Sequence, residues 1–313
     1  MRSSRAGEAM RDGRVVASHG RDATVEDDAG RRFGCRLRGR GLAVVCGVRV
    51  RWSQADTEGG SGIVVEVLPR RCLLERIDAR GAAEPVAANL TQLVAVVAPV
   101  PAPDFGLCDR YLAAAEWSGL AACVVANKCD LEDPSGDIAR ALEEYARIGY
   151  AIVRASRRLE GGVDALRIRL AGETSVLVGQ SGVGKSSLTN RLVPGVEAAV
   201  DEVSRASESG RHTTSTAFMY ALPSGGELID SPGVRDFAPP LPPAREVASG
   251  YREIAAFARD CRFRDCLHRA EPGCAVARAF ASGEIPARRL ESYRRLLALA
   301  EGLAERAPPR IRR

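Results

Sequence analysis

The sequence predicts a multi-domain chain of three consecutive units: a small β-barrel, an α/β unit, and a mostly helical C-terminal unit. Three patterns support this prediction. Short alternating stretches fill the first part, strand-like and helix-like stretches alternate from Leu90 onward, and three cysteines cluster with a histidine after residue 260. At roughly 150 residues per domain, 313 residues allow two or more domains. We place the boundaries at residues 1–85, 86–240 and 241–313.

The N-terminal region contains stretches in which apolar and polar residues alternate, as in strands with one buried face. They include residues 14–17, 48–52 and 62–67, separated by turns rich in glycine and aspartate. This pattern favours a five-stranded oligonucleotide-binding (OB-fold) barrel. Phe33 and Trp52 are the only aromatic residues before Phe105. We therefore expect contacts with the nucleic-acid backbone to dominate over base stacking.

Apolar runs of strand length alternate with helical stretches in the central region. The expected strands are residues 93–97, 121–126, 151–153, 175–178 and 228–229, and the expected helices are residues 108–117, 137–148, 162–170 and 185–192. This alternation predicts a mostly parallel sheet with helices on both faces. Such folds bind ligands at the carboxyl ends of their strands, so polar motifs that directly follow a strand are candidate site residues.

Only two of the 45 basic residues are lysines, and one of them is Lys185. It lies in a G-x-x-x-x-G-K-S pattern made of Gly179, Gln180, Ser181, Gly182, Val183, Gly184, Lys185 and Ser186, followed by Ser187. In this pattern the glycines let backbone N–H groups surround phosphate oxygens, and the lysine reaches the β- and γ-phosphates. The pattern follows an expected strand and opens an expected helix, which is the context that a phosphate loop requires.

The other lysine lies in Asn127-Lys128-Cys129-Asp130, directly after the expected strand 121–126. The Asp130 carboxylate can accept from guanine N1–H and from the exocyclic amino group, a donor pair that adenine does not present. The motif therefore predicts binding of GTP rather than ATP. Ala155 and Ser156 follow the next expected strand and are expected to add backbone contacts at the guanine edge.

The guanine motif precedes the phosphate loop, which reverses the order found in ordinary GTPases. A threonine-rich segment with Thr213 and Thr214 follows, and then the stretch from Asp230 to Gly233. This order predicts a circularly permuted P-loop GTPase domain. We expect Ser186 and Asp230 to hold Mg²⁺ with the bound GTP. Thr213 or Thr214 is expected to close over the γ-phosphate, and Gly233 to lie at the nucleotide.

Val234 follows Gly233, where Ras-like GTPases carry a water-orienting glutamine. Because valine cannot polarise water, we expect slow intrinsic hydrolysis of GTP. His212, in the threonine-rich segment, is the nearest candidate for a catalytic group that orients the attacking water. The alternative is that His212 has a structural role or contacts a partner.

Cys261, Cys266, His268 and Cys274 form a C-x₄-C-x-H-x₅-C pattern. Three thiolates and one imidazole make a closed tetrahedral shell that suits one structural Zn²⁺ and leaves no position for a reacting water. The alternative is a group of buried free cysteines beside an unrelated histidine. The other six cysteines stand singly, as expected of reduced core residues.

Charge is distributed unevenly along the chain. Residues 1–85 carry 16 basic and 12 acidic residues, residues 86–240 carry 14 and 19, and residues 241–313 carry 15 and 9. Two basic flanks around an acidic centre indicate a polyanion such as RNA as the partner, unless the arginines are only solvated surface residues. No apolar run reaches the ~20 residues of a membrane span, and the N-terminus lacks an apolar signal core, so we expect a cytoplasmic protein without membrane contact.

Four stretches together resemble the bacterial ribosome small subunit-dependent GTPase A (RsgA) family. They are residues 179–187 (GQSGVGKSS), 210–214 (GRHTT), 229–234 (IDSPGV) and 261–275, which contains the cysteine-rich pattern. The resemblance covers residues 10–300 in domain order. It implies an OB-fold barrel, a permuted GTPase domain and a zinc-binding helical domain. It also implies a checkpoint GTPase that binds 16S rRNA of the small (30S) subunit in late maturation, is stimulated by the subunit and leaves after hydrolysis.

The sequence leaves a second function open. In this alternative the protein is a GTP-gated RNA-binding or anti-association factor, and hydrolysis to GDP only resets binding. Turnover assays with ribosomal subunits separate the two, because only the first function needs strong stimulation of hydrolysis. We expect a monomer in either case.

Overall fold

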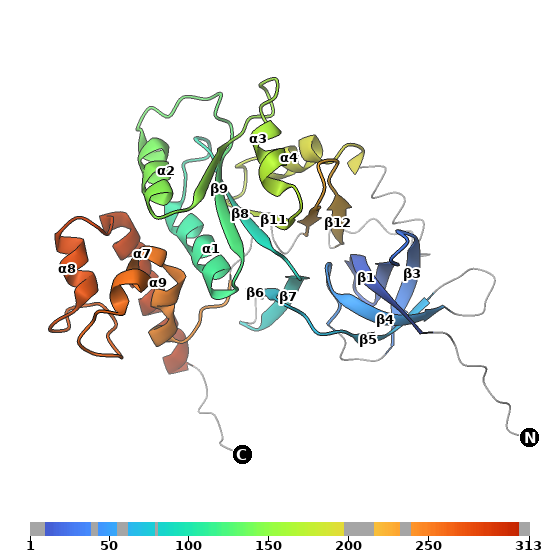
Figure 1. Cartoon of the computed structure of the whole chain (residues 1–313), viewed down its shortest axis with the longest axis horizontal. Coiled ribbons are helices and arrows are strands. Elements are labelled where there is room, and N and C mark those ends of the chain that lie inside the picture. The colour runs from blue at the N-terminus through green and yellow to red at the C-terminus, as the bar shows by residue number, and fades with distance from the viewer. Residues whose placement is uncertain are drawn as a thin grey trace, which may run out of the picture.

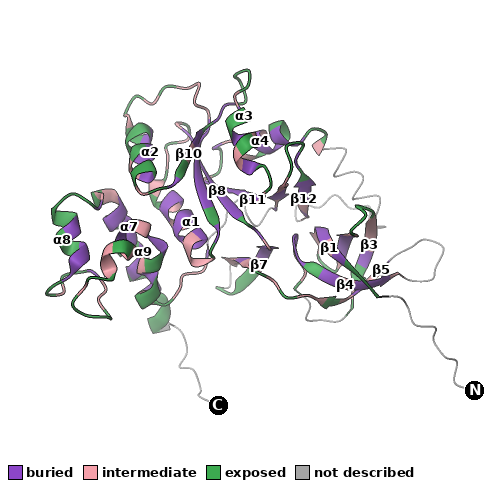
Figure 2. Cartoon of the chain, viewed as in Figure 1, coloured by how far each residue is buried: buried purple, intermediate pink, exposed green. Residues whose placement is uncertain are grey.

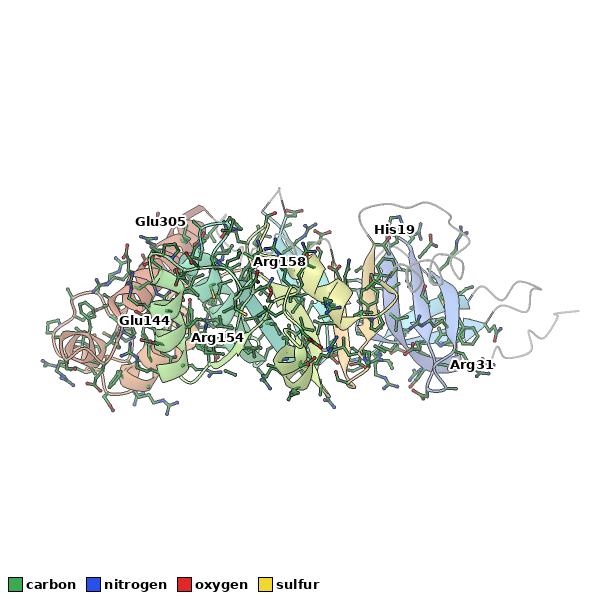
Figure 3. All side chains as sticks on the ribbon, turned by 90° about the horizontal axis from the view of Figure 1, so that it is seen from above. His19, Arg31, Glu144, Arg154, Arg158 and Glu305 are labelled. Carbon is green, nitrogen blue, oxygen red and sulfur yellow. The ribbon has the colours of Figure 1, made fainter. Side chains whose placement is uncertain are left out.

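The computed structural model describes residues 10–38, 43–54, 62–78, 81–196, 216–231 and 239–306. These residues form an elongated molecule (Figure 1). The barrel lies at one end, the C-terminal helices lie at the other, and the α/β unit lies between them. In a perpendicular view, His19 and Arg31 mark the barrel end, and Glu144 lies toward the opposite end (Figure 3).

Five N-terminal strands close into a barrel. They are β1 (Met10–His19), β2 (Asp22–Glu26), β3 (Arg32–Leu37), β4 (Arg49–Gln54) and β5 (Gly62–Val67). The ring runs β1-β2-β3-β5-β4 and closes by pairing of β4 with β1, and every pair is antiparallel except β3 with β5. Alternating residues such as Val25, Val50 and Val64 fill the interior around the fully buried Trp52. The predicted five-stranded barrel is confirmed.

The central sheet has the predicted parallel arrangement. Its strands are β8 (Gln92–Val97), β9 (Ala121–Ala126), β10 (Ala151–Arg154), β11 (Thr174–Val178), β12 (Ala217–Ala221) and β13 (Glu227–Asp230). The spatial order is β10-β9-β8-β11-β13-β12, with only β12 antiparallel to its neighbour β13. The strand before Asn127 precedes the phosphate-loop strand in the chain, yet both end at the same edge of the sheet. This is the predicted permuted arrangement.

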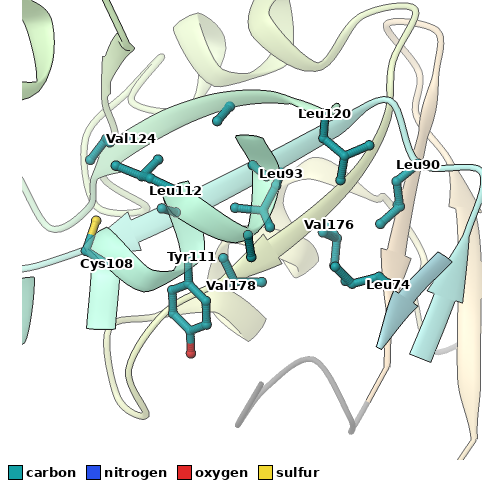
Figure 4. Packing of buried hydrophobic residues seen from close by; sticks show 14 of the residues in the cluster. Leu74, Leu90, Leu93, Cys108, Tyr111, Leu112, Leu120, Val124, Val176 and Val178 are labelled. Carbon is teal, nitrogen blue, oxygen red and sulfur yellow. The ribbon is translucent and has the colours of Figure 1, made fainter. Parts of the chain in front are cut away.

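Helices cover both faces of this sheet, as predicted. They are α1 (Phe105–Trp117), α2 (Asp137–Arg147), α3 (Asp164–Leu170) and α4 (Lys185–Leu192). Figure 4 shows one face, where Leu112 of α1 packs with Leu93 and Val124 of the strands. On the other face, Leu166 of α3 and Leu188 of α4 pack with the alternate residues of the same strands.

The remaining elements lie on either side of the central unit. A hairpin of β6 (Leu73–Ile77) and β7 (Ala83–Ala88) leads from the barrel into β8. The C-terminal part consists of the 3₁₀ helix η1 (Ala244–Gly250), α7 (Arg252–Ala258), α8 (Ala275–Ala281) and α9 (Ala287–Arg306). Their inward surfaces are buried and their outward surfaces are exposed (Figure 2). None of the helices in the described part of the chain is long and apolar enough to cross a membrane.

The barrel and the central sheet share hydrogen bonds. β1 pairs with β12 through Ala17 opposite Phe218 and Ser18 opposite Ala217, so the described strands include one continuous sheet of eleven. Sequence patterns had not indicated β12, which has only five residues. The domain boundaries at residues 85 and 240 stay predictions.

Candidate nucleotide and metal sites

Three predicted motifs meet at the carboxyl edge of the central sheet. Asn127 directly follows β9, Gly179 directly follows β11, and Asp230 is the last residue of β13. Because β9, β8, β11 and β13 are parallel neighbours, their carboxyl ends lie side by side. The order of the strands in the sheet therefore brings together three motifs that are far apart in the chain.

The guanine motif is bonded directly to the phosphate loop. The buried Asn127 donates from Nδ2 to Val183 O at 2.8 Å. Lys128 has a positive φ of 56°, and its Nζ donates to Gly182 O at 2.8 Å and to Val100 O at 2.6 Å. Two residues of the guanine motif thus bond to carbonyl oxygens of the phosphate loop. These bonds fix the position of the guanine motif relative to the phosphate loop.

Asp130 is held as an ionised acceptor. The Ser156 hydroxyl donates to Oδ1 at 2.5 Å, and Arg158 Nη1 lies 3.6 Å from Oδ2. The Ser156 hydrogen bond, with a smaller contribution from Arg158, lowers the pKa of the Asp130 carboxyl. Ser156 acts here through its side chain, whereas the sequence had suggested backbone contacts at the base. The sequence reasoning missed Arg158, although a cation two residues after Ser156 was a usable signal.

The phosphate loop requires its glycines. Gly179, Gly182 and Gly184 have φ values of 149°, 81° and 99°, which favour glycine. A Cβ at Gly184 would also lie 2.5 Å from Asn127 Nδ2, and one at Gly179 would overlap Val96 O. The loop is therefore packed against β8 and against the guanine motif, and side chains at these two positions would force them apart.

The loop leads into the N-terminus of α4, where the helix dipole and the N–H groups of the first turn favour an anion. Lys185 is the first residue of this helix, and its Nζ donates to the carbonyl oxygens of Gly179 and Gln180. Ser186 and Ser187 follow in the first turn, with Ser186 exposed. The ammonium is thus held over the loop, at the place where the motif puts phosphates.

A cavity of about 310 Å³ connects the base and phosphate ends of this cluster. Its lining includes Asn127, Lys128, Asp130, Ser156, Arg157, Arg158, Gly184 and Ser187. The volume lies at the lower end of the range for small-molecule sites, roughly 300 to 1,000 Å³. The arrangement can bind a guanine base at Asp130 and phosphates at the loop. Arg158 is exposed, and Figure 3 places it on the α/β unit between the barrel and the C-terminal helices.

Asp230 reaches the same edge from the neighbouring strand. Val176 of β11 is paired with Ile229, so Asp230 lies one residue further toward the loop that β11 enters. This places Asp230 beside the end of the strand that enters the phosphate loop, on the side away from the strand that precedes the guanine motif. His212, Thr213, Thr214, Gly233 and Val234 lie outside the described residues.

The four residues of the predicted metal site come together. Their ligand atoms all lie within 4.8 Å of one another. His268 Nδ1 is 3.6 Å from the sulfurs of Cys261 and Cys274, which are 4.0 Å apart, and Cys266 completes the group. Burial lowers the pKa of His268, which favours the neutral imidazole that binds metals. The cluster can hold a metal ion.

Backbone donors support the sulfurs of this cluster. The N–H groups of Ala275 and Ala277, at the start of α8, point to the sulfurs of Cys261 and Cys274 at 3.3 and 3.4 Å. Such bonds stabilise thiolates and orient them toward a metal. The segment that holds the cluster is also bonded to α9, because the hydroxyl of Tyr293 donates to Leu267 O at 2.8 Å.

The barrel aromatics offer little surface for stacking on bases. Trp52 is fully buried, and Phe33 is half-buried with its ring 4.7 Å from that of Trp52. The Arg31 guanidinium lies 5.9 Å from the Phe33 ring and covers it in part. Arginine contacts with a backbone of phosphates suit this surface better than stacking does.

The chain is similar to proteins of known families. A family model described as RsgA GTPase matches residues 67–239. A protein of Chromohalobacter salexigens named small ribosomal subunit biogenesis GTPase RsgA is 48% identical over 299 residues, covering 94% of this chain and 86% of that protein. A protein of the same name from Azotobacter vinelandii is 44% identical over 292 residues, covering 91% and 84%.

Two solved structures share the fold. The crystal structure of YjeQ from Thermotoga maritima matches with a TM-score of 0.75 and 31% identity, covering 94% of this chain and 99% of that chain. The structure of YloQ, described as a circularly permuted GTPase, matches with a TM-score of 0.72 and 25% identity, covering 97% and 99%.

Proposed function

The chain belongs to the RsgA GTPase family, and from this membership we propose that it is a GTPase of small ribosomal (30S) subunit biogenesis. In this proposal it binds 16S rRNA late in subunit maturation and hydrolyses GTP to GDP and phosphate when the subunit stimulates it. The observation that carries the nucleotide part is the direct bonding of Asn127 and Lys128 to the phosphate loop. The names of the relatives support the ribosomal part.

Binding of GTP would use the cavity as follows. Asp130 accepts from the guanine edge, while Lys185 exchanges the carbonyl oxygens of the loop for β- and γ-phosphate oxygens. Ser186 and Asp230, on either side of the phosphates, would hold Mg²⁺. When bound, this ion neutralises charge on the β- and γ-phosphates. Thr213, Thr214 and Gly233 are proposed as further nucleotide contacts.

The experiment that tests this function measures GTP turnover of the full chain alone, with purified small subunits, and with large subunits as a control. Free turnover is expected to fall well below the roughly 1 to 100 s⁻¹ typical of kinases, because Val234 cannot orient water. Small subunits should raise it strongly and large subunits should not. A subunit-independent rate would favour the alternative, a GTP-gated RNA-binding or anti-association factor.

The same assay tests His212 as the catalytic group. His212→Ala should leave the affinities for GTP and for the small subunit nearly unchanged but remove most of the stimulated hydrolysis. His19→Ala, in the barrel, is the matched control. Full stimulation of His212→Ala would assign water positioning to a ribosomal group and leave His212 as a structural residue.

Base preference is tested at Asp130. Asp130→Asn should weaken GTP binding and favour xanthine nucleotides, because the amide offers a donor where the carboxylate only accepts. Asp137→Asn, on the exposed start of α2 outside the cavity, is the control. Nucleotide titrations of both variants give the comparison. Equal affinity of the unaltered chain for ATP and GTP would contradict the assignment.

We propose zinc as the metal of the cysteine cluster. A tetrahedral Zn²⁺ shell places sulfurs about 3.8 Å apart and sulfur about 3.6 Å from nitrogen, close to the observed 4.0 and 3.6 Å. Cys261→Ser or His268→Ala should lower the zinc content from about one ion per chain, whereas Cys72→Ser, outside the cluster, should not. Elemental analysis of chain purified without chelators checks this, and absence of zinc would refute it.

The remaining properties follow from the same proposal. The units at residues 1–85 and 241–313 would contact rRNA through their basic surfaces, so salt should weaken binding to the small subunit. We propose a cytoplasmic monomer without membrane contact. Light scattering of the purified chain tests the monomer, and dimers at micromolar concentration would contradict it.

A further inference from the structure

A single carboxylate joins the barrel to the two strands that lead into the nucleotide site. Arg14 of β1 donates from Nη1 to Glu227 Oε1 at 2.7 Å. Thr174 donates from Oγ1 to Glu227 Oε2 at 2.6 Å. Glu227 is the first residue of β13, which ends at Asp230, and Thr174 is the first residue of β11, which enters the phosphate loop. Both oxygens of Glu227 are therefore engaged at the amino ends of these strands.

A backbone connection runs parallel to this ion pair. Phe218 of β12 is opposite Ala17 of β1 on one side and opposite Asp230 of β13 on the other. The hydrogen-bonded ladder is thus continuous from the barrel to the residue proposed to hold the ion. All four residues of β13 are paired with residues of β12, so a displacement of one strand is passed to the other.

The barrel also approaches the residue before Asp230. Gly47, in the barrel, has a φ of 90°, and a Cβ there would overlap Ala88 O and lie 3.5 Å from Ile229 Cδ1. Asn89 Nδ2 donates to Gly47 O at 2.8 Å, which holds the turn in place. Val16 of the barrel belongs to the same buried cluster as Ile229. The barrel therefore bonds the first residue of β13 and lies close to Ile229 near its other end.

We propose that Arg14 and Glu227 are positioning residues for GTP hydrolysis, which couple docking of the barrel on RNA to the placement of Asp230. This inference rests on the proposed function. β13 rises about 3.3 Å per residue and is paired along both edges, so it moves as a unit and passes a shift of Glu227 on to Asp230. The side chains of Arg14 and Glu227 are 34% and 23% exposed, so this ion pair can rearrange without burying an unpaired charge.

The test compares Arg14→Met and Glu227→Gln with the unaltered chain. The measured quantities are GTP affinity, basal turnover, small-subunit affinity and the maximal stimulated rate. Each single variant should lower the maximal stimulated rate by roughly 3- to 30-fold, while GTP affinity and basal turnover stay within about 2-fold.

Arg49→Met is the matched control, because it removes the same charge from the same barrel. Arg49 pairs with the exposed Asp28 at 3.5 Å and, within the described residues, its side chain makes no hydrogen bond or ion pair to β13, so its loss reports only weaker attraction to RNA. A stimulated rate of Arg14→Met equal to that of Arg49→Met would overturn the proposal. Equal losses in basal and stimulated turnover would also overturn it, because they would show a merely structural role.

A second measurement needs no ribosome and separates this inference from the proposed function. Amide hydrogen exchange of β1 and β12 is compared between the chain bound to GDP and bound to a non-hydrolysable GTP analogue. Because coupling between sites is reciprocal, protection in β1 should depend on the nucleotide, and Arg14→Met should reduce that difference. Protection of β1 that is the same in both states overturns the inference, even if small subunits stimulate turnover.

Discussion

The central sheet is attached to its two neighbours in opposite ways. The barrel is joined by a partly exposed ion pair and a two-residue strand pairing. The C-terminal helices are joined by buried charges: Arg289 of α9 is fully buried and donates to Asp109 of α1 at 2.8 Å and to Glu253 of α7 at 2.7 Å. Glu253 belongs to the C-terminal part, so the bond between Arg289 and Asp109 is the one that connects the C-terminal helices to the central unit.

Neighbouring groups extend this buried joint. Arg288 bonds Asp109 at 2.9 Å and Glu144 of α2 at 2.8 Å, and the Tyr145 hydroxyl donates to Asp109 at 2.7 Å. Arg288 is 26% exposed, whereas Asp109 and Arg289 are fully buried and pair with each other. Any movement that separated them would leave a charge unpaired in the interior, which costs several kcal/mol. The C-terminal joint therefore fixes one geometry, whereas the barrel joint allows adjustment.

The largest effect is expected from breaking the buried joint. Arg289→Met should lower the free energy of unfolding by about 3 to 5 kcal/mol, because it leaves Glu253 without its cation in the interior. Arg295→Met, on the same helix but exposed and, among the described residues, paired only with Glu291, should change it by less than about 0.5 kcal/mol. Denaturant titrations of both variants make the comparison. Equal losses of unfolding free energy in the two variants would show that burial of an ion pair does not increase the cost of breaking it here.

A smaller effect is expected where the barrel meets the central unit. Gly47→Ala should destabilise the chain by about 1 to 3 kcal/mol, because the new Cβ meets Ala88 O at a positive φ. Gly20→Ala is the control, since Gly20 also has a positive φ but has open space around it. The difference in thermal midpoint between the two variants isolates the contact. Identical midpoints would show that the close approach of Gly47 to Ala88 does not contribute to stability.

The smallest effect on stability is expected at the barrel ion pair itself. Arg14→Met should cost less than about 1 kcal/mol, and the cost should shrink further in high salt, which screens a partly exposed pair. Unfolding measured at low and high salt, beside Arg289→Met, completes the comparison. A salt-independent cost as large as that of Arg289→Met would mean that the two joints are equally rigid.

Local patterns determined much of the fold and the candidate site. The spans of β5, β9 and α4 agree with the expected residues, and the other expected strands and helices differ by a few residues at their ends. The phosphate loop, the guanine motif and the cysteine cluster were recognisable because each consists of residues close in sequence whose chemistry depends on their spacing. The barrel was recognisable because alternation of apolar residues reports a buried face.

How these parts contact one another depends on packing between distant segments of the chain. Arg14 and Glu227 are separated by 213 residues, and Arg289 and Asp109 by 180, so no spacing pattern connects them. Pairing of β1 with β12 involves two residue pairs, which leave no periodic signal in either strand. Sequence reports which side chains prefer burial, but sheet order and packing determine which distant charges meet there. That is why the sequence indicated the nucleotide and metal sites, and the fold alone revealed the connections between them.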